Sequence, residues 1–155
     1  MTDLFMAQTP PFFHLAVVDW EVLEARLAAL EGCVVRVLDA SAAISPAALF
    51  QEAGRALDFP AAFQGSWDAL DEGLTDLEWL PGRRIVLAVR EAGLLLSTSP
   101  EDLELLVEIL ITTAEAWAEA SLPTIPLSFH VILQDRLEAL QPWIEVLQEL
   151  EVDFE

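Results

Sequence analysis

The sequence predicts a single α/β domain over residues 1–155, with a small three-stranded parallel sheet packed by helices in two or three layers. Short apolar segments alternate with helical patterns in the order strand, helix, helix, strand, helix, strand. Residues 85–89 are continuously apolar between Arg84 and Arg90, which is typical of a strand buried on both faces of a parallel sheet. A chain of 155 residues is long enough to bury a substantial core, and a hydrophobic fraction of 54% argues for a folded rather than a disordered acidic chain.

Each predicted element has a local signal. Serine before proline marks helix starts at Ser45 and Ser99, because serine caps the first turn and proline fits its first position. Asp19 and Ser66 are further predicted caps, and β-branched or apolar runs predict the strands. The predicted elements are an edge strand or arm at 12–18, a helix at 20–30, a strand at 34–38, helices at 46–57 and 67–77, a strand at 85–89, a helix at 100–120, a strand at 127–133 and a final helix at 136–151.

The helix predicted at residues 67–77 carries acidic side chains on one face. At 100° per residue, Asp71, Glu72 and Asp76 fall within about 80° of Asp68. The opposite face is apolar and consists of Trp67, Leu70, Leu74 and Leu77. Like charges three or four residues apart destabilise a helix, so this face is a candidate surface for a positively charged ligand.

The charge of the chain excludes several classes of partner. It has 7 arginines and no lysine against 27 acidic residues, a formal net charge of −20. Such a surface repels nucleic acid and anionic lipid, whereas a basic protein would be its complement. The single Cys33 allows no intrachain disulfide, and the sequence has neither a basic secretory signal nor an apolar run long enough to span a bilayer. We therefore expect a cytoplasmic protein without direct nucleic-acid or membrane binding.

Other interpretations of the acidic face remain open at this point. It could be a solvated surface, or Asp68, Asp71 and Glu72 could bind a divalent cation, since hard cations take carboxylate oxygens. Catalysis is poorly supported, because His14 and His130 lie in apolar strand-like runs and no phosphate loop or zinc motif is present. We expect no enzymatic activity, no catalytic residue, no metal and no cofactor.

Several segments resemble the barstar-like family of ribonuclease inhibitors. The similarity covers a core at residues 34–133, flanked by an N-terminal arm and helix at 1–33 and an extra C-terminal helix at 134–155. The most specific part is the loop and helix at 59–77. The other segments that carry it are residues 35–39, Leu57, Asp58, the apolar strand at 85–89 and the closing strand at 129–133.

The resemblance implies that the acidic helix and the preceding loop block the active site of a basic ribonuclease. Glu72 falls where the family has its most important aspartate, and Asp71 falls where a tryptophan is common. The implied partner-binding residues are Ala62, Phe63, Gly65, Ser66, Asp68, Asp71, Glu72 and Asp76. The alternative is an acidic adaptor that keeps the fold but binds a different protein, and the apolar excess leaves self-association open.

Overall fold

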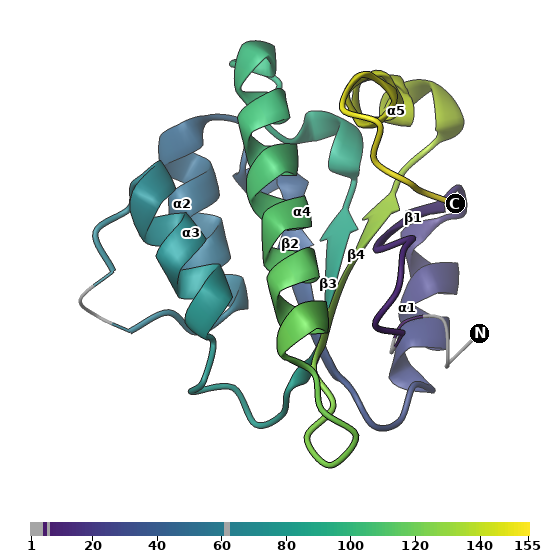
Figure 1. Cartoon of the computed structure of the whole chain (residues 1–155). Helices are drawn as coiled ribbons and strands as arrows, with labels where there is room; N and C mark the ends of the chain where they lie inside the picture. Colours follow the sequence, from purple (N-terminus) through teal and green to yellow (C-terminus); the bar gives the residue numbers. More distant parts are fainter. Residues whose placement is uncertain (1–4, 6, 61–62) are drawn as a thin grey trace.

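The computed structural model describes residue 5, residues 7–60 and residues 63–155. Four parallel strands form one sheet in the order β1-β4-β3-β2 (Figure 1). The strands are β1 (Phe13–Ala16), β2 (Val34–Asp39), β3 (Arg84–Arg90) and β4 (Ser128–Gln134). The α-helices are α1 (Trp20–Ala28), α2 (Pro46–Ala56), α3 (Trp67–Asp76), α4 (Leu103–Ala120) and α5 (Leu137–Glu149), and the short 3-10 helices are η2 (Ala40–Ala42), η3 (Ala92–Leu94) and η4 (Pro100–Asp102).

The α/β class predicted from the sequence is confirmed, but the prediction of three strands was wrong. Residues 13–16 pair with β4, with Phe13 opposite Val131 and Leu15 opposite Leu133, and make β1 a fourth strand. From the sequence this segment could be a strand or an arm, because it is short and its partner lies far along the chain. At its other edge β1 is covered by the end of the chain, since Leu15 N–H donates to Glu155 O over 2.7 Å.

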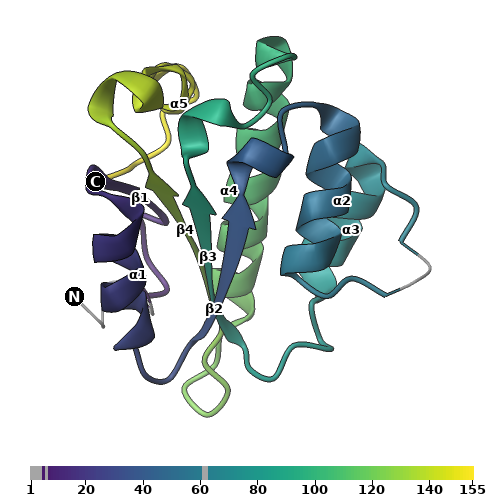
Figure 2. The ribbon, with the colours of Figure 1, turned by 180° about the vertical axis from the view of Figure 1, so that it is seen from behind.

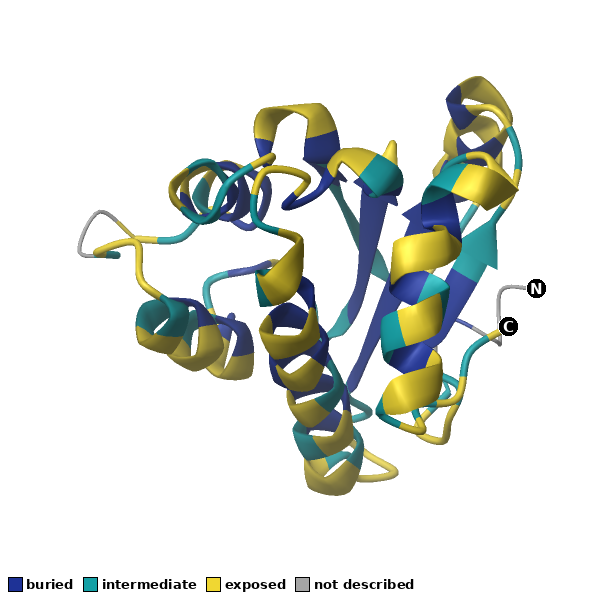
Figure 3. Ribbon diagram, turned by 90° about the horizontal axis from the view of Figure 1, so that it is seen from above, coloured by how far each residue is buried: buried dark blue, intermediate teal, exposed yellow. Residues whose placement is uncertain are grey.

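Helices cover both faces of the sheet, which therefore forms the middle of three layers. Trp20, Leu23 and Leu27 of α1 pack against Val86, Ala88 and Ile132 on the rear face. The remaining helices bury their apolar sides against the front face, as Figures 1 and 2 show from opposite directions. Figure 3 colours the chain by burial and shows the helices with buried residues on the inner side and exposed residues on the outer side. None of the described helices is long and apolar enough to cross a bilayer.

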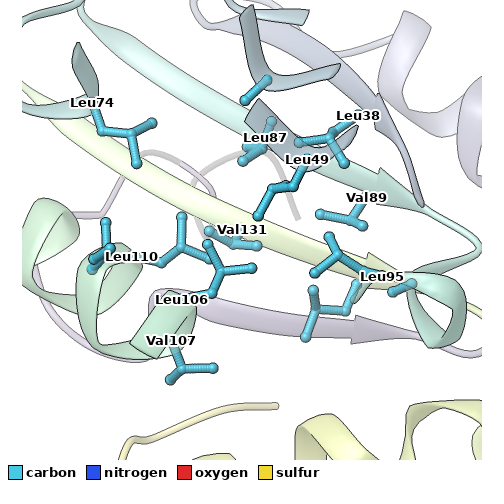
Figure 4. Close-up of a cluster of buried hydrophobic side chains, with 14 of the residues drawn as sticks. Leu38, Leu49, Leu74, Leu87, Val89, Leu95, Leu106, Val107, Leu110 and Val131 are labelled. Atoms are coloured by element: carbon cyan, nitrogen blue, oxygen red, sulfur yellow. The ribbon is translucent and has the colours of Figure 1, made fainter. Parts of the chain in front are cut away.

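The front core is mainly aliphatic, and Figure 4 shows part of it. Side chains from β2, β3 and β4 meet others from α2, α3 and α4 there. Those labelled are Leu38, Leu49, Leu74, Leu87, Val89, Leu95, Leu106, Val107, Leu110 and Val131. The predicted central strand is confirmed, since residues 85–89 of β3 are all buried between two neighbouring strands.

Three tryptophans on the front of the sheet donate their indole N–H groups to backbone carbonyls. Trp79 bonds to Leu57 O at the end of α2 over 2.8 Å, and Trp117 of α4 bonds to Leu74 O of α3 over 3.1 Å. Trp143 of α5 bonds to Ala92 O over 2.8 Å. Because carbonyls in the last turn of a helix have no partner within the helix, the bonds to Leu57 and Leu74 satisfy orphan acceptors while joining neighbouring elements.

The predicted helix caps are confirmed at two of four positions. Ser45 and Ser66 accept hydrogen bonds from Ala48 N–H and Ala69 N–H, at 3.3 and 3.0 Å. Asp19 makes no side-chain cap bond, and the Ser99 hydroxyl instead donates to the Asp102 carboxylate over 2.9 Å. The chain after Ser99 therefore opens with η4 before α4 begins.

A pair of buried histidines joins β1 to β4. His130 Nε2 lies 2.8 Å from Ala7 O, so this nitrogen donates, and His130 Nδ1 accepts from His14 Nε2, also at 2.8 Å. His14 Nδ1 then has no proton and no partner among the described residues. Burial, with a smaller contribution from His130, lowers the pKa of His14 to about 4, and burial lowers the pKa of His130. Both rings are neutral in this arrangement.

Acid should destabilise the fold through His14. The unfolded chain binds a proton there near pH 6.5 and the folded protein only near pH 4, so the stability contributed by the neutral ring is complete above pH 6.5 and is lost as the pH falls toward 4. Between pH 7 and pH 5, wild type should lose about 2 kcal/mol more than His14→Gln in urea unfolding. Glutamine keeps an N–H donor but does not titrate. Equal losses in the two proteins would contradict a neutral buried His14.

Candidate functional site

A groove runs along α3 and combines acidic and aromatic side chains. It lies between α3 and the segment that follows α2, and its volume is about 460 Å³. Its acidic side consists of Asp68, Glu72 and Asp76. Its aromatic side consists of Phe59, Phe63 and Trp79. We call it the α3 groove.

The acidic side follows from the geometry of α3. Asp68, Glu72 and Asp76 are spaced four residues apart, so they lie on one face with a rise of about 6 Å between neighbours. All three are exposed, while Leu70 and Leu74 on the other side of α3 are buried. Ser66 caps the helix, and Asp68 lies in the first turn, where the helix macrodipole stabilises an anion. The apolar face therefore anchors α3 and leaves its carboxylates to solvent.

The aromatic side is held by contacts between its own rings. The Phe59 ring packs edge-on against Phe63 at 4.6 Å and against Trp79 at 5.8 Å, measured between ring centroids. The bond from Trp79 to Leu57 O fixes the indole at the end of α2. Edge-on ring contacts and this partly buried hydrogen bond together hold the three rings in place as one wall of the groove.

Gly73 lets this wall approach the helix. A Cβ at position 73 would lie 3.0 Å from Phe59 Cζ and 3.2 to 3.3 Å from two other ring carbons. These distances are shorter than normal contacts between carbon atoms, so the ring could not keep its place against a larger residue. A glycine in the middle of α3, usually unfavourable to a helix, thus determines the width of the groove.

Arginines close to the groove are already engaged. Arg36 pairs with Asp58 at 2.7 Å, and Arg55 bonds to the buried carboxylate of Glu52. Arg83 bonds to the backbone carbonyl of Asp76, not to its carboxylate, and stacks on Trp117 at 4.3 Å. Within the described residues, no ion pair involves Asp68, Glu72 or Asp76. The groove therefore presents unneutralised charge.

Unpaired carboxylates facing aromatic rings suit one kind of group. A guanidinium or ammonium is attracted both by carboxylates and by the faces of aromatic rings, and its aliphatic stem packs on the rings. The described residues contain no group of three or more histidine, cysteine or acidic side chains able to hold a metal ion. The groove is thus suited to basic side chains of a protein.

Most of the residues that the sequence singled out lie at this surface. Phe63, Ser66, Asp68, Glu72 and Asp76 line the α3 groove. Gly65 lines a neighbouring hollow, Asp71 is exposed but is not among the lining residues, and Ala62 lies outside the described residues. Sequence analysis missed the roles of Trp79 and Gly73. The glycine inside a predicted helix was the available signal for a close approach.

A larger hollow of about 570 Å³ lies elsewhere, at the carboxyl ends of β1, β3 and β4. Local structure accounts for much of its charge. Arg90 stacks over Trp20 at 5.6 Å, and Asp135 accepts bonds from Gly93 N–H and Arg136 N–H. Glu21 and Glu138 occupy first turns of helices, where acids are stabilising. We therefore favour the α3 groove, where a first-turn position accounts for Asp68 but not for Glu72 or Asp76.

The close contact between Phe59 and Gly73 can be tested by measuring the free energy of unfolding of glycine-to-alanine variants. Replacing a glycine inside a helix by alanine normally stabilises it by about 1 kcal/mol. Gly54→Ala in α2 should gain this amount, because its Cβ would lie at an ordinary 3.8 Å from Phe63. Gly73→Ala should gain clearly less or lose stability, because Phe59 must move. Urea unfolding of both variants gives the comparison, and equal gains would contradict the close fit.

Comparison with known proteins gives a family for this arrangement. The model of the family described as "Barstar (barnase inhibitor)" matches residues 33–134, from the start of β2 to the end of β4. A comparison with curated proteins found no match. The segment that contains α3 and its groove thus lies inside the matched region, while β1, α1 and α5 lie outside it.

A solved structure shares the fold. It is titled "Structure of the Aeropyrum Pernix ORC2 protein (ADPNP-ADP complexes)" and matches with 12% sequence identity and a TM-score of 0.52. The match covers 99% of this chain and 43% of that chain, so this chain spans less than half of its length. At this identity the likeness concerns the fold alone. The family match covers more than half of the 155 residues, and the chain therefore belongs to the barstar family.

Proposed function

We propose that this protein inhibits a basic ribonuclease by inserting the acidic face of α3 into the active site of the enzyme. The observation that carries the proposal is the unneutralised row of Asp68, Glu72 and Asp76 beside an aromatic wall. It lies in the segment matched to a family described by its inhibition of barnase. The protein partner follows from the family, and the identity of the nuclease is part of the proposal.

The mechanism is substitution of carboxylates for phosphates. An enzyme that cleaves RNA must hold an anionic backbone, so its active site concentrates cationic side chains. Carboxylates repeated along one face of a helix offer such a site an alternative set of negative charges. The cap at Ser66 and the bond from Trp117 to Leu74 O hold α3 in place in the free protein. Binding therefore costs little conformational entropy in this helix.

The rest of the molecule assists the encounter. A net charge of −20 produces a long-range negative potential that attracts a basic partner and raises the association rate. The same potential disfavours RNA as a competing ligand. The four acidic residues of α3 thus add to a negative potential that the whole protein produces.

An acidic adaptor would use the same groove, because its chemistry recognises basic side chains whatever protein carries them. The two functions differ in their effect on catalysis. An inhibitor abolishes RNA cleavage at one equivalent, whereas an adaptor binds its partner and leaves catalysis intact.

The inhibition assay uses barnase, the enzyme named in the description of the family. One equivalent of wild-type protein should abolish RNA cleavage. Glu72→Gln and Asp68→Asn should each raise the inhibition constant at least about tenfold, because each leaves a buried cation of the enzyme unpaired. Glu145→Gln on the exposed side of α5 is the matched control and should change it less than about threefold.

The losses in Glu72→Gln and Asp68→Asn should be larger at low ionic strength. If both variants inhibit as well as wild type, the acidic face is not the interface. Binding without loss of cleavage would favour the adaptor.

The substitution Glu72→Gln, which should weaken inhibition, should also make the free protein more stable. Glu72 is repelled by Asp68 and Asp76, each four residues away, so Glu72→Gln should raise the free energy of unfolding by about 0.5 kcal/mol at low salt. Glu145→Gln removes one such repulsion, with Glu149, and should gain about half as much. Urea unfolding at 10 mM and 1 M salt measures both gains, which should vanish at high salt. A loss of stability in Glu72→Gln would mean that Glu72 serves the fold.

A further inference from the structure

A second hollow adjoins the α3 groove on the side of α2. Its volume is about 470 Å³, and it is lined by Ala47, Phe50, Gln51 and Gly54 of α2 together with residues 63–65. Phe63 and Gln64 also line the α3 groove, so the two depressions form one surface with the Phe63 ring between them. We call the second depression the α2 hollow.

The chemistry of the α2 hollow differs from that of its neighbour. None of its lining residues is ionisable, although the chain carries 27 acidic residues. Its apolar surface comes from two phenylalanines, an alanine and glycine backbone, and its polar groups are the amides of Gln51 and Gln64. Such a lining suits an uncharged side chain with an apolar body and a polar tip.

The floor of the α2 hollow is preformed. The Phe50 ring is buried and packs edge-on against Trp67 at 5.1 Å. Gly65 has φ of +61°, which a residue with a side chain adopts only with strain, and its bare backbone lies against Phe50. Gly54 likewise leaves room beside Phe63. A cavity that exists before binding spares the partner the cost of opening it.

We propose that the α2 hollow receives one uncharged aromatic side chain, a tyrosine or tryptophan, of the same basic partner that occupies the α3 groove. This inference rests on the proposed function, because continuity with the groove identifies the occupant. Interfaces concentrate their affinity in buried aromatic anchors, and Tyr and Trp are the commonest of these. Charge in the groove would determine the association rate, and the aromatic anchor would determine the dissociation rate.

Two isosteric substitutions separate this contact from general electrostatics. Gln51→Glu and Gln141→Glu each add one negative charge to an exposed helical position, the first at the rim of the α2 hollow and the second on α5. If only net charge mattered, both variants would inhibit barnase as well as wild type or slightly better. The proposal expects Gln51→Glu to weaken inhibition at least about tenfold and Gln141→Glu to leave it unchanged. Equal effects would overturn it.

A second measurement does not depend on any nuclease. N-acetyl-tryptophanamide, an uncharged probe, should shift the amide resonances of Gly54 and Gly65 in a saturable titration. N-acetyl-argininamide, a cationic probe, should shift Glu72 and Asp76 in the α3 groove instead. Absence of the shifts at Gly54 and Gly65 would overturn the proposal for the hollow.

The two probes distinguish a failure of the proposed function from a failure of the proposal for the α2 hollow. If wild type does not inhibit barnase, the proposed function fails for that enzyme, and the tryptophanamide titration still decides whether the hollow binds aromatic side chains. If barnase is inhibited and Glu72→Gln weakens inhibition, but Gly54 and Gly65 do not respond, the proposed function stands and the hollow has no such role.

Discussion

The placement of α1 to α4 depends on the rule that parallel strands are joined by right-handed connections across a face of the sheet. The chain passes from β1 at one edge to β2 at the other, so α1 must cross behind the sheet. It then returns through β3 to β4, so α2, α3 and α4 must lie in front. The α3 groove is consequently built over the β2 side of the front face, with the mainly aliphatic core beneath it.

Charge and packing are separated within α3. The buried side of α3 meets the core and the indole of Trp117, and it contains no ionisable group. The exposed side collects carboxylates that repel one another, and the nearby arginines have other partners. A sequence selected for stability alone would place a basic residue beside Glu72, since such pairs support a helix. Retaining the repulsion is typical of a surface selected for binding.

Local signals allowed much of this fold to be predicted. Ser45 and Ser66 fixed two helix starts, and the apolar run at 85–89 identified the central strand. Two local signals failed, since Asp19 and Ser99 make no side-chain cap bond. The other features that were not predicted depend on contacts distant in sequence. Residues 13–16 became a strand only because β4 offers them an edge, and the partner of His14 is His130. In the site, periodicity placed the carboxylates, but the wall of Phe59 against Gly73 needs a loop to fold back on a helix.

The end of the chain lies far from the groove. Phe154 pairs with Phe13 at the β1 edge, and α3 lies on the opposite side of the molecule (Figures 1 and 2). A tether attached through the C-terminus would therefore leave α3 pointing away from its support. Sensor surfaces, affinity resins and fluorescent fusions built in this way would present the acidic face without obstruction.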